Sequence, residues 1–318
     1  MLDVIKPGLL TTVQDLGRTG MAAMGFSRSG AMDPLAASAA NLLLDQPANT
    51  PLLECTLLGP QLRFDCDSVF ALSGAIMDAE LDGEAVTVGQ AITVQAGQTL
   101  KLGRARIGCR CYLAIKGGLK VAAVLGSVST QLNSQIGGWH GRALRAGDRL
   151  PIAASDRSAP GYCASWLGLA TESPDQIKTV AALPQLAAED HPLYQSEWRI
   201  DPRSDRMGFR LDGSPLANAN ASNDGLSEPV QAGTIQLPRG GQPIVLMADS
   251  QPTGGYNQLA QIAAADLPLL AQLAPGQSLR LVCCKLDQAQ RMLAEQQYRL
   301  QRLAFAARRC WNTTATTR

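Results

Sequence analysis

Short apolar runs separated by glycine-containing turns dominate the first half of this sequence, and they recur about every ten residues. Clear examples are residues 69–72, 91–94, 99–102 and 111–115. Runs this short suit strands better than helices, and their regular spacing favours a barrel or a sandwich over alternating strands and helices. The sequence therefore predicts a mainly β protein of the α+β type, with a few short helices and one C-terminal helix.

A turn-then-strand pattern occurs in both halves of the chain. Residues 97–102 read GQTLKL, residues 147–150 read GDRL and residues 276–281 read GQSLRL. This echo predicts two related β domains.

Between these halves the composition shifts toward Ala, Ser, Pro and Gly. The predicted division is a first domain over 1–152, a connecting segment over 153–195, a second domain over 196–286, and an amphipathic helix with a tail over 287–318. Within the connecting segment, one strand is expected near residues 178–182.

Two helices have clear start signals. Asp33 followed by Pro34 is typical of an N-cap and a first helical position, and the apolar residues 35–44 continue the pattern. Asp287 stands before a stretch with apolar residues at helical spacing. This stretch predicts a final amphipathic helix that ends near Arg309.

The composition excludes several classes of function. The chain has 318 residues, 46% of them hydrophobic, and a formal net charge of +1. A balanced charge argues against binding to nucleic acid or to a membrane surface, because both normally need a basic excess. None of the six lysines follows a glycine, so the sequence contains no Walker A loop for phosphate. The sequence start has no signal-peptide pattern, and we expect a cytoplasmic protein.

The cysteines and histidines form no metal-binding pattern. No Cys-x-x-Cys pair occurs among the eight cysteines, and the two histidines, His140 and His191, are far apart in the sequence. Zinc sites usually show closely spaced ligand pairs. We therefore expect no metal ligands on this chain.

The stretch most suggestive of a functional site is residues 240–256, GGQPIVLMADSQPTGGY. A short apolar strand ends at Asp249, and an amide, a hydroxyl and two glycines follow. Such polar groups gather at the mouth of a barrel or at a sheet edge, and the glycines allow a ligand close to the backbone. A tight hairpin capped by Asp249 is the alternative. The predicted catalytic residues are Asp249, Gln251, Thr253 and Tyr256.

A second set of polar residues is predicted to bind the substrate. Asp205 and Arg206 form either a local ion pair or a site where the guanidinium takes a substrate carboxylate through two hydrogen bonds. Asp15 and Arg18, in a glycine-punctuated loop, allow the same two interpretations. The remaining candidates for substrate binding are Asp33 and Ser73.

Ordered motifs along nearly the whole chain resemble those of a known family. They are TTVQDLGRTG (11–20), SGAMDP (29–34), LECTLLGP (53–60), LSGA (72–75), LGSVST (125–130), GGWHGR (137–142), SDRMGFRL (204–211) and DSQPTGGY (249–256). The chain is identified by them as a member of the biotin-dependent carboxyltransferase-like family. This family includes the C subunit of 5-oxoprolinase, allophanate hydrolase subunit 2, the carboxyltransferase part of urea carboxylase and an antagonist of a kinase inhibitor.

The resemblance implies two β-barrel domains of the cyclophilin-like type. The terminal helix looks most like that of the C subunits of 5-oxoprolinases, which implies ATP-dependent cleavage of 5-oxoproline to L-glutamate together with homologues of the A and B subunits. The implied cofactor is ATP with Mg²⁺, without covalently attached biotin. The alternatives are a carboxyltransferase of the allophanate hydrolase subunit 2 type and a non-enzymatic antagonist of a kinase inhibitor. Pro252 stands where relatives usually carry threonine, so only Thr253 supplies a hydroxyl there.

Overall fold

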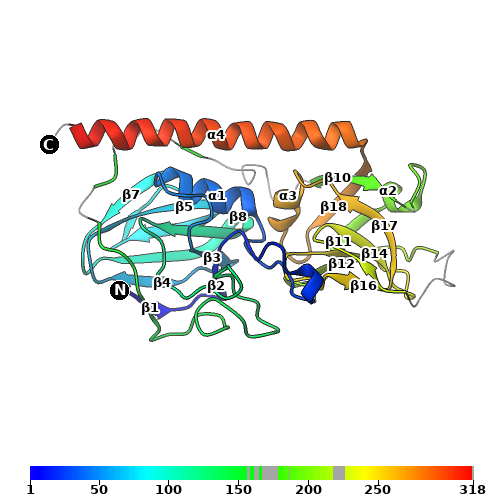
Figure 1. Ribbon diagram of the computed structural model, residues 1–318, viewed down its shortest axis with the longest axis horizontal. Coiled ribbons are helices and arrows are strands. Elements are labelled where there is room, and N and C mark those ends of the chain that lie inside the picture. Colours follow the sequence, from blue (N-terminus) through cyan, green and yellow to red (C-terminus); the bar gives the residue numbers. More distant parts are fainter. Residues whose placement is uncertain (156–157, 161–164, 167–177, 186, 218–225, 317–318) are drawn as a thin grey trace.

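The structure is a computed structural model that describes residues 1–318 except 156–157, 161–164, 167–177, 186, 218–225 and 317–318. Two β domains lie side by side along the long axis, and one long helix runs along the same side of both (Figure 1). The prediction of a mainly β protein with few helices and a C-terminal helix is confirmed.

The first domain is built on one antiparallel sheet. In the described residues its strands are β1 (Leu2–Lys6), β2 (Leu10–Gln14), β3 (Leu52–Thr56), β4 (Gln61–Phe64), β5 (Ser68–Leu81), β6 (Glu84–Ala85), β7 (Ala91–Val94), β8 (Thr99–Ile115) and β9 (Arg149–Leu150). The main path runs β2-β3-β8-β4-β1-β9, and β5 pairs with β6, β7 and β8. Phe64, Phe70 and Leu113 are fully buried in its core.

The second domain is a closed barrel. Within the described residues its strand order is β10-β17-β14-β15-β12-β11-β18. The strands are β10 (Lys178–Pro184), β11 (Glu197–Ile200), β12 (Gly208–Asp212), β14 (Thr234–Leu237), β15 (Ile244–Leu246), β17 (Asn257–Ile262) and β18 (Ser278–Cys283), with β13 (Glu228–Pro229) and β16 (Thr253–Gly254) as a separate pair. In the barrel core, Trp198 Nε1 donates to Leu193 O at 2.9 Å, in the short helix α2 (Pro192–Gln195).

The barrel begins earlier in the chain than the predicted boundary at residue 196. The strand expected near residues 178–182 is present as β10, but it pairs in parallel with β18 and antiparallel with β17. These two pairings close the barrel, so β10 belongs to the second domain and not to a connection. Its partners lie far along the chain, and for this reason the local composition gave no sign of the pairing. Parts of the predicted connection lie outside the described residues.

The predicted start of helix α1 (Pro34–Leu43) is confirmed. Asp33 is its N-cap, and Asp33 Oδ1 accepts a hydrogen bond from Ala36 N at 2.8 Å. Helix α4 (Leu286–Thr316) begins one residue before the predicted cap, so Asp287 lies in its first turn. Two further short helices are η1 (Ala22–Met24) and α3 (Leu267–Ala271). In the described part of the chain, no helix combines the length and the apolar character required to cross a membrane.

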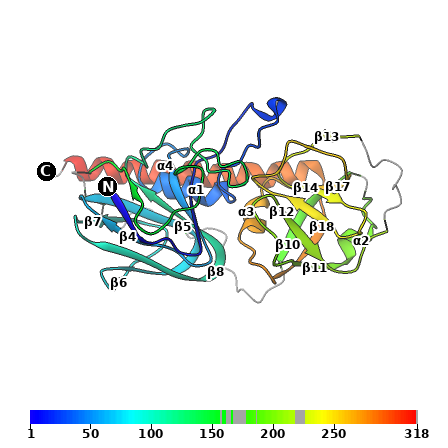
Figure 2. The same ribbon diagram turned by 90° about the horizontal axis from the view of Figure 1, so that it is seen from below.

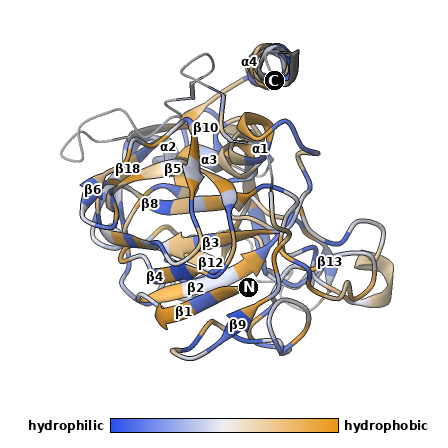
Figure 3. Cartoon of the chain, turned by 90° about the vertical axis from the view of Figure 1, so that its left-hand side faces the viewer, coloured by the Kyte–Doolittle hydropathy of each residue, from blue (hydrophilic) through white to orange (hydrophobic). Residues whose placement is uncertain are grey.

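Helix α4 contacts both domains. Near its start, Ala289 and Met292 pack against the barrel residues Ala181 and Ala263. Near its end, Leu303, Ala307 and Trp311 pack with α1 in a cluster of the first domain; Trp311 Nε1 donates to the carbonyl of Leu43, at the end of α1, at 3.0 Å. Seen along the long axis, α4 lies on the same side as α1 (Figure 3). One continuous helix therefore bridges the two domains.

We expect Trp311→Ala to lower the free energy of unfolding by about 3–5 kcal/mol, because it empties a fully buried aromatic site. The control is Phe305→Ala on the same helix, where the side chain is 65% exposed. That change should stay within about 0.5 kcal/mol. Denaturant unfolding of both variants measures the difference, and equal stabilities would show that α4 does not anchor the first domain through Trp311.

Candidate functional site

A buried polar cluster, here called the interdomain seam, joins the two domains through Arg206. Arg206 Nε and Nη2 donate to the two carboxylate oxygens of Asp249, both at 2.9 Å. Nη2 also donates to Gly30 O at 2.6 Å, and Nη1 donates to Glu54 of β3. All three guanidinium nitrogens are thus bound by protein groups from both domains.

The seam continues from Glu54 into the first domain. Glu54 Oε2 accepts hydrogen bonds from Tyr112 O–H and from Met32 N, both at 2.8 Å. The Tyr112 oxygen in turn accepts from Asp33 N at 2.8 Å. Because Met32 and Asp33 precede α1, these bonds fix the loop that leads into that helix.

Gln272 ties the barrel side of the seam to the same residues. Its Nε2 donates to Asp33 Oδ2 at 2.8 Å, and its Oε1 accepts from the backbone N–H groups of Cys109 and Arg110 on β8, both at 3.0 Å. Gly108 makes room for this approach, since a Cβ there would lie 2.8 Å from Gln272 Oε1. A side chain of the second domain therefore completes hydrogen bonds inside the sheet of the first.

Burial shifts the protonation of several seam groups. Burial lowers the pKa of Arg206, but Glu54 and Asp249 raise it overall, so the guanidinium stays charged. Burial, and then the charge of Glu54, hold the pKa of Tyr112 well above its ordinary value. Burial raises the pKa of Asp33 to about 6 against the hydrogen bonds that favour its carboxylate. The Asp33 carboxyl therefore changes charge near pH 6.

A cavity of about 470 Å³ lies beside the seam. One wall comes from residues of the 16–34 loop of the first domain, and the other from barrel residues 230–232, 247–248, 250–252, 261, 264 and 267. This loop carries η1 and reaches from the first domain toward the barrel near β13 (Figure 2). Phe26, Met32, Met247 and Leu267 give the cavity apolar surface. Its position between two domains is typical of small-molecule sites.

Arg18 lines this cavity and is only 2% exposed. Its Nε donates to Val124 O at 3.3 Å and its Nη2 donates to Ser129 O. Its Nη1 is buried and has no acceptor among the described residues. Burial lowers the pKa of Arg18, while the charges of Asp15 and Asp249 oppose that shift.

Asp15 holds the loop that carries the acceptors of Arg18. Its carboxylate accepts hydrogen bonds from the Ser127 and Ser129 hydroxyls and from Val128 N. It also accepts from Gly17 N at 2.8 Å. Asp15 and Arg18 thus both bind the 124–129 loop, and Asp15 places a negative charge close to the buried guanidinium.

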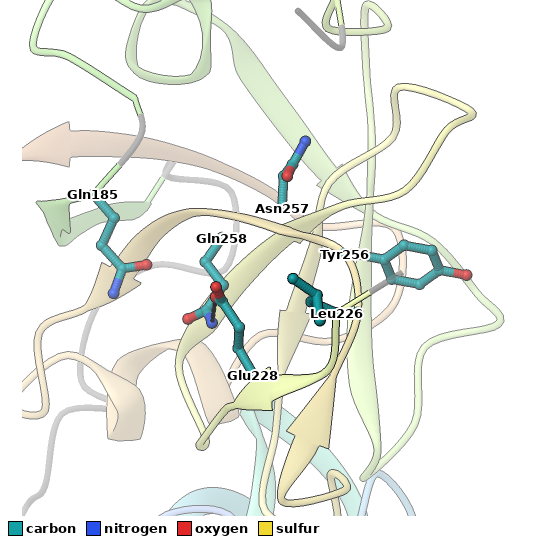
Figure 4. Close-up of a pocket in the computed structure, with 7 residues that line it drawn as sticks. Gln185, Leu226, Glu228, Tyr256, Asn257 and Gln258 are labelled. Carbon is teal, nitrogen blue, oxygen red and sulfur yellow. Dashed lines mark hydrogen bonds between the residues drawn. The ribbon is translucent and has the colours of Figure 1, made fainter. Parts of the chain in front are cut away.

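The predicted catalytic residues lie in different places. Asp249 is buried in the seam, and Gln251 lines the cavity. Thr253 is an exposed residue of β16, paired with Pro229 of β13. Tyr256 lines a separate hollow of about 510 Å³, where its ring extends away from Glu228 and Gln258 (Figure 4). These four side chains are close in sequence but do not form one group in the structure, and their catalytic role stays a prediction.

The residues predicted to bind substrate divide in the same way. Arg206 and Asp33 belong to the seam, and Arg18 lines the cavity. Asp205 is exposed and closes a turn by accepting from Met207 N at 2.8 Å. Ser73 is fully buried in β5, opposite Tyr112 of β8. Of the residues predicted to bind substrate, Arg18 is the one that lines the cavity among the described residues.

Several residues of the site were missed by reasoning from the sequence. Glu54 is a carboxylate inside the apolar run 52–56, and such a charge on a buried strand signals a buried partner. Tyr112 and Gln272 carried no signal, because their partners are distant in sequence. Ser29 lines the cavity, is 4% exposed, and its Oγ has no partner among the described residues.

No group of three or more His, Cys, Asp or Glu side chains suited to a metal ion occurs in the described residues. The seam carboxylates are instead satisfied by Arg206, Tyr112 and backbone N–H groups. The candidate site is a cavity beside a charged, hydrogen-bonded seam.

Comparison with known proteins finds similarity over almost the whole chain. The family model described as carboxyltransferase domain, subdomain A and B, matches residues 24–283. The chain is 40% identical to the C subunit of 5-oxoprolinase from Escherichia coli (strain K12), over 96% of its own length and 98% of that protein. It is 38% identical to the Haemophilus influenzae protein of the same name, over 92% of this chain and 94% of that one.

A solved structure shows the same fold. The K. lactis urea amidolyase superposes on 95% of this chain with a TM-score of 0.85 and 28% sequence identity. This chain spans 20% of that much longer protein. The two domains thus occur both as a short chain and as one part of a large one.

Asp249→Asn tests the role of the seam. The variant leaves Arg206 with one carboxylate partner in a buried site, and we expect it to lower the free energy of unfolding by about 3 kcal/mol. The control is Asp205→Asn, beside Arg206 in the sequence but on an exposed turn that asparagine also supports, with a change within about 0.5 kcal/mol. Chemical denaturation measures both. Unchanged stability of Asp249→Asn with lost turnover would instead support the catalytic role predicted for Asp249.

Asp33 gives the protein a specific dependence on pH. In the folded protein the Asp33 carboxyl keeps its proton up to about pH 6, whereas in the unfolded chain it releases the proton near pH 3.8. The stabilising contribution of the proton is therefore complete below about pH 4 and is lost as the pH rises through 6, a change on the order of 3 kcal/mol. Unfolding free energies at several pH values should show this fall in the wild type and not in Asp33→Asn. The same pH slope in both proteins would contradict it.

Proposed function

The chain belongs to the family of the carboxyltransferase domain, subdomain A and B, and we propose that it serves as the C subunit of an ATP-dependent 5-oxoprolinase. The observation that carries this proposal is the 40% identity to a protein of that name over 98% of the relative's length. That match covers nearly all of the relative, whereas the match to the K. lactis urea amidolyase covers only 20% of that longer chain.

The reaction opens the lactam of 5-oxoproline to give L-glutamate and is coupled to ATP hydrolysis. In this proposal the interdomain cavity holds the substrate, with apolar side chains against the ring and polar ones such as Gln251 at the amide. The 16–34 loop and the barrel enclose the substrate from opposite sides. The seam then acts by holding these two walls in fixed positions.

Neither the sequence nor the described residues show a recognisable site for ATP or Mg²⁺ on this chain. The sequence contains no Walker A loop, and the described residues contain no carboxylate cluster suited to a metal ion. We therefore place nucleotide binding with the A and B subunits of the enzyme, and assign no step of ATP chemistry to these residues. The assembly is proposed to work in the cytoplasm.

Carboxyl transfer is the second candidate function. The family model and the K. lactis urea amidolyase structure favour it. The sequence has no Met-Lys biotin-attachment motif, so carboxybiotin would come from another protein. The same cavity would then receive the acceptor of the carboxyl group.

Reconstitution separates the two functions. We expect 5-oxoproline-dependent ATP hydrolysis when this chain is mixed with homologues of the A and B subunits, and a loss of at least about a hundredfold when any one is omitted. The readouts are phosphate release and glutamate formation. Full turnover without this chain, or by this chain alone, would contradict the proposal; carboxylation of an acceptor by free carboxybiotin would support the second candidate.

A further inference from the structure

We infer that Arg18 and Ser29 form a carboxylate subsite within the interdomain cavity. Its ligand is a small monocarboxylate; that this is the carboxylate of 5-oxoproline rests on the proposed function. The inference begins from two residues that line one cavity, Arg18 and Ser29; each has a buried polar atom, Nη1 and Oγ, for which the described residues provide no hydrogen-bond partner.

Arg18 carries a buried N–H donor, Nη1, that has no acceptor among the described residues. A charged donor that is buried without an acceptor costs several times more than an ordinary missing hydrogen bond. Asp15 does not relieve this, because its carboxylate is engaged by Ser127, Ser129, Val128 and Gly17. The guanidinium is also fixed by its bonds to two backbone carbonyls, so it is oriented before any ligand arrives.

Backbone contacts place Ser29 in the same unit as Arg18. Arg18 N donates to Arg28 O at 2.7 Å, and Ala31 N donates to Asp15 O at 2.8 Å. Gly17 and Gly30 pack so closely that a Cβ on Gly30 would lie 2.8 Å from Gly17 N. Ser29 itself has a φ of 54°, a conformation that a serine adopts only when its surroundings impose it. The two segments are therefore locked together beside the cavity.

The charged side chains that line the cavity favour an anion. Its lining includes Arg18 and Arg28 and, among the described residues, no Asp or Glu. A carboxylate accepts hydrogen bonds from a guanidinium and a hydroxyl, which are the two kinds of group left unpaired. The surrounding apolar walls suit a small ring, and the volume suits a molecule of this size. A cationic ligand would add a like charge beside Arg18, and a neutral carbonyl would accept a hydrogen bond without compensating the charge of the guanidinium.

Direct binding to the full-length chain tests the subsite without any assumption about catalysis. Calorimetric titration compares 5-oxoproline with its neutral carboxamide, which differs only in the charged group. We expect the carboxylate to bind at least about tenfold more tightly, and Arg18→Lys to remove most of that difference because lysine does not reproduce the oriented donor. Ser29→Ala should reduce it about threefold. Equal binding of acid and carboxamide would overturn the subsite.

Steady-state kinetics in the reconstituted complex provide the second readout. Arg18→Lys and Ser29→Ala should raise KM for 5-oxoproline with kcat changed less than about twofold. The matched control is Arg203→Lys, an exposed arginine paired with Asp201 outside the cavity, which should leave KM unchanged. Circular dichroism and thermal unfolding verify that each variant is folded.

The outcomes separate this inference from the proposed function. A complex that hydrolyses ATP with 5-oxoproline, but shows wild-type KM in both variants, overturns the subsite and leaves the proposed function standing. A complex without that activity, in which the chain still prefers carboxylate over carboxamide through Arg18, overturns the proposed function and supports the subsite.

Discussion

The arrangement of the two domains depends on one buried cation between two carboxylates. Arg206 binds Asp249 of its own domain with two hydrogen bonds and reaches Glu54 of the other domain, far from bulk solvent. A buried charge of this kind contributes little net stability when it is complete, yet removal of one partner is costly. The seam therefore specifies a single relative placement of the domains and strongly disfavours others.

The cavity follows from this placement. Through Gly30, Met32 and Asp33 the seam holds the start of α1, and the same loop supplies one cavity wall. The barrel supplies the other wall directly after Asp249, at Ser250 and Gln251. The stretch that follows the barrel strand is thus close to the site, as its composition indicated, although its carboxylate faces the seam.

The features of the fold that depend on short stretches of sequence were predicted correctly. Short apolar runs indicated the β character, and the Asp33–Pro34 pair indicated the start of α1, because both signals lie within a few residues. β10 was expected as a strand, but its place in the barrel was missed because its partners β17 and β18 follow about 80 to 100 residues later. The seam was missed for the same reason, since Glu54 and Arg206 are 152 positions apart. Pairing across such separations is set by tertiary packing, which a local pattern does not contain.

Helix α4 has a consequence for motion. A single helix that packs against both domains restricts their relative movement, because a hinge motion about the seam would remove either Ala289 or Trp311 from its packing contacts. We therefore expect the gap between the domains to keep a constant width when ligand enters and leaves. Ligand then enters and leaves the cavity without a hinge movement of the two domains.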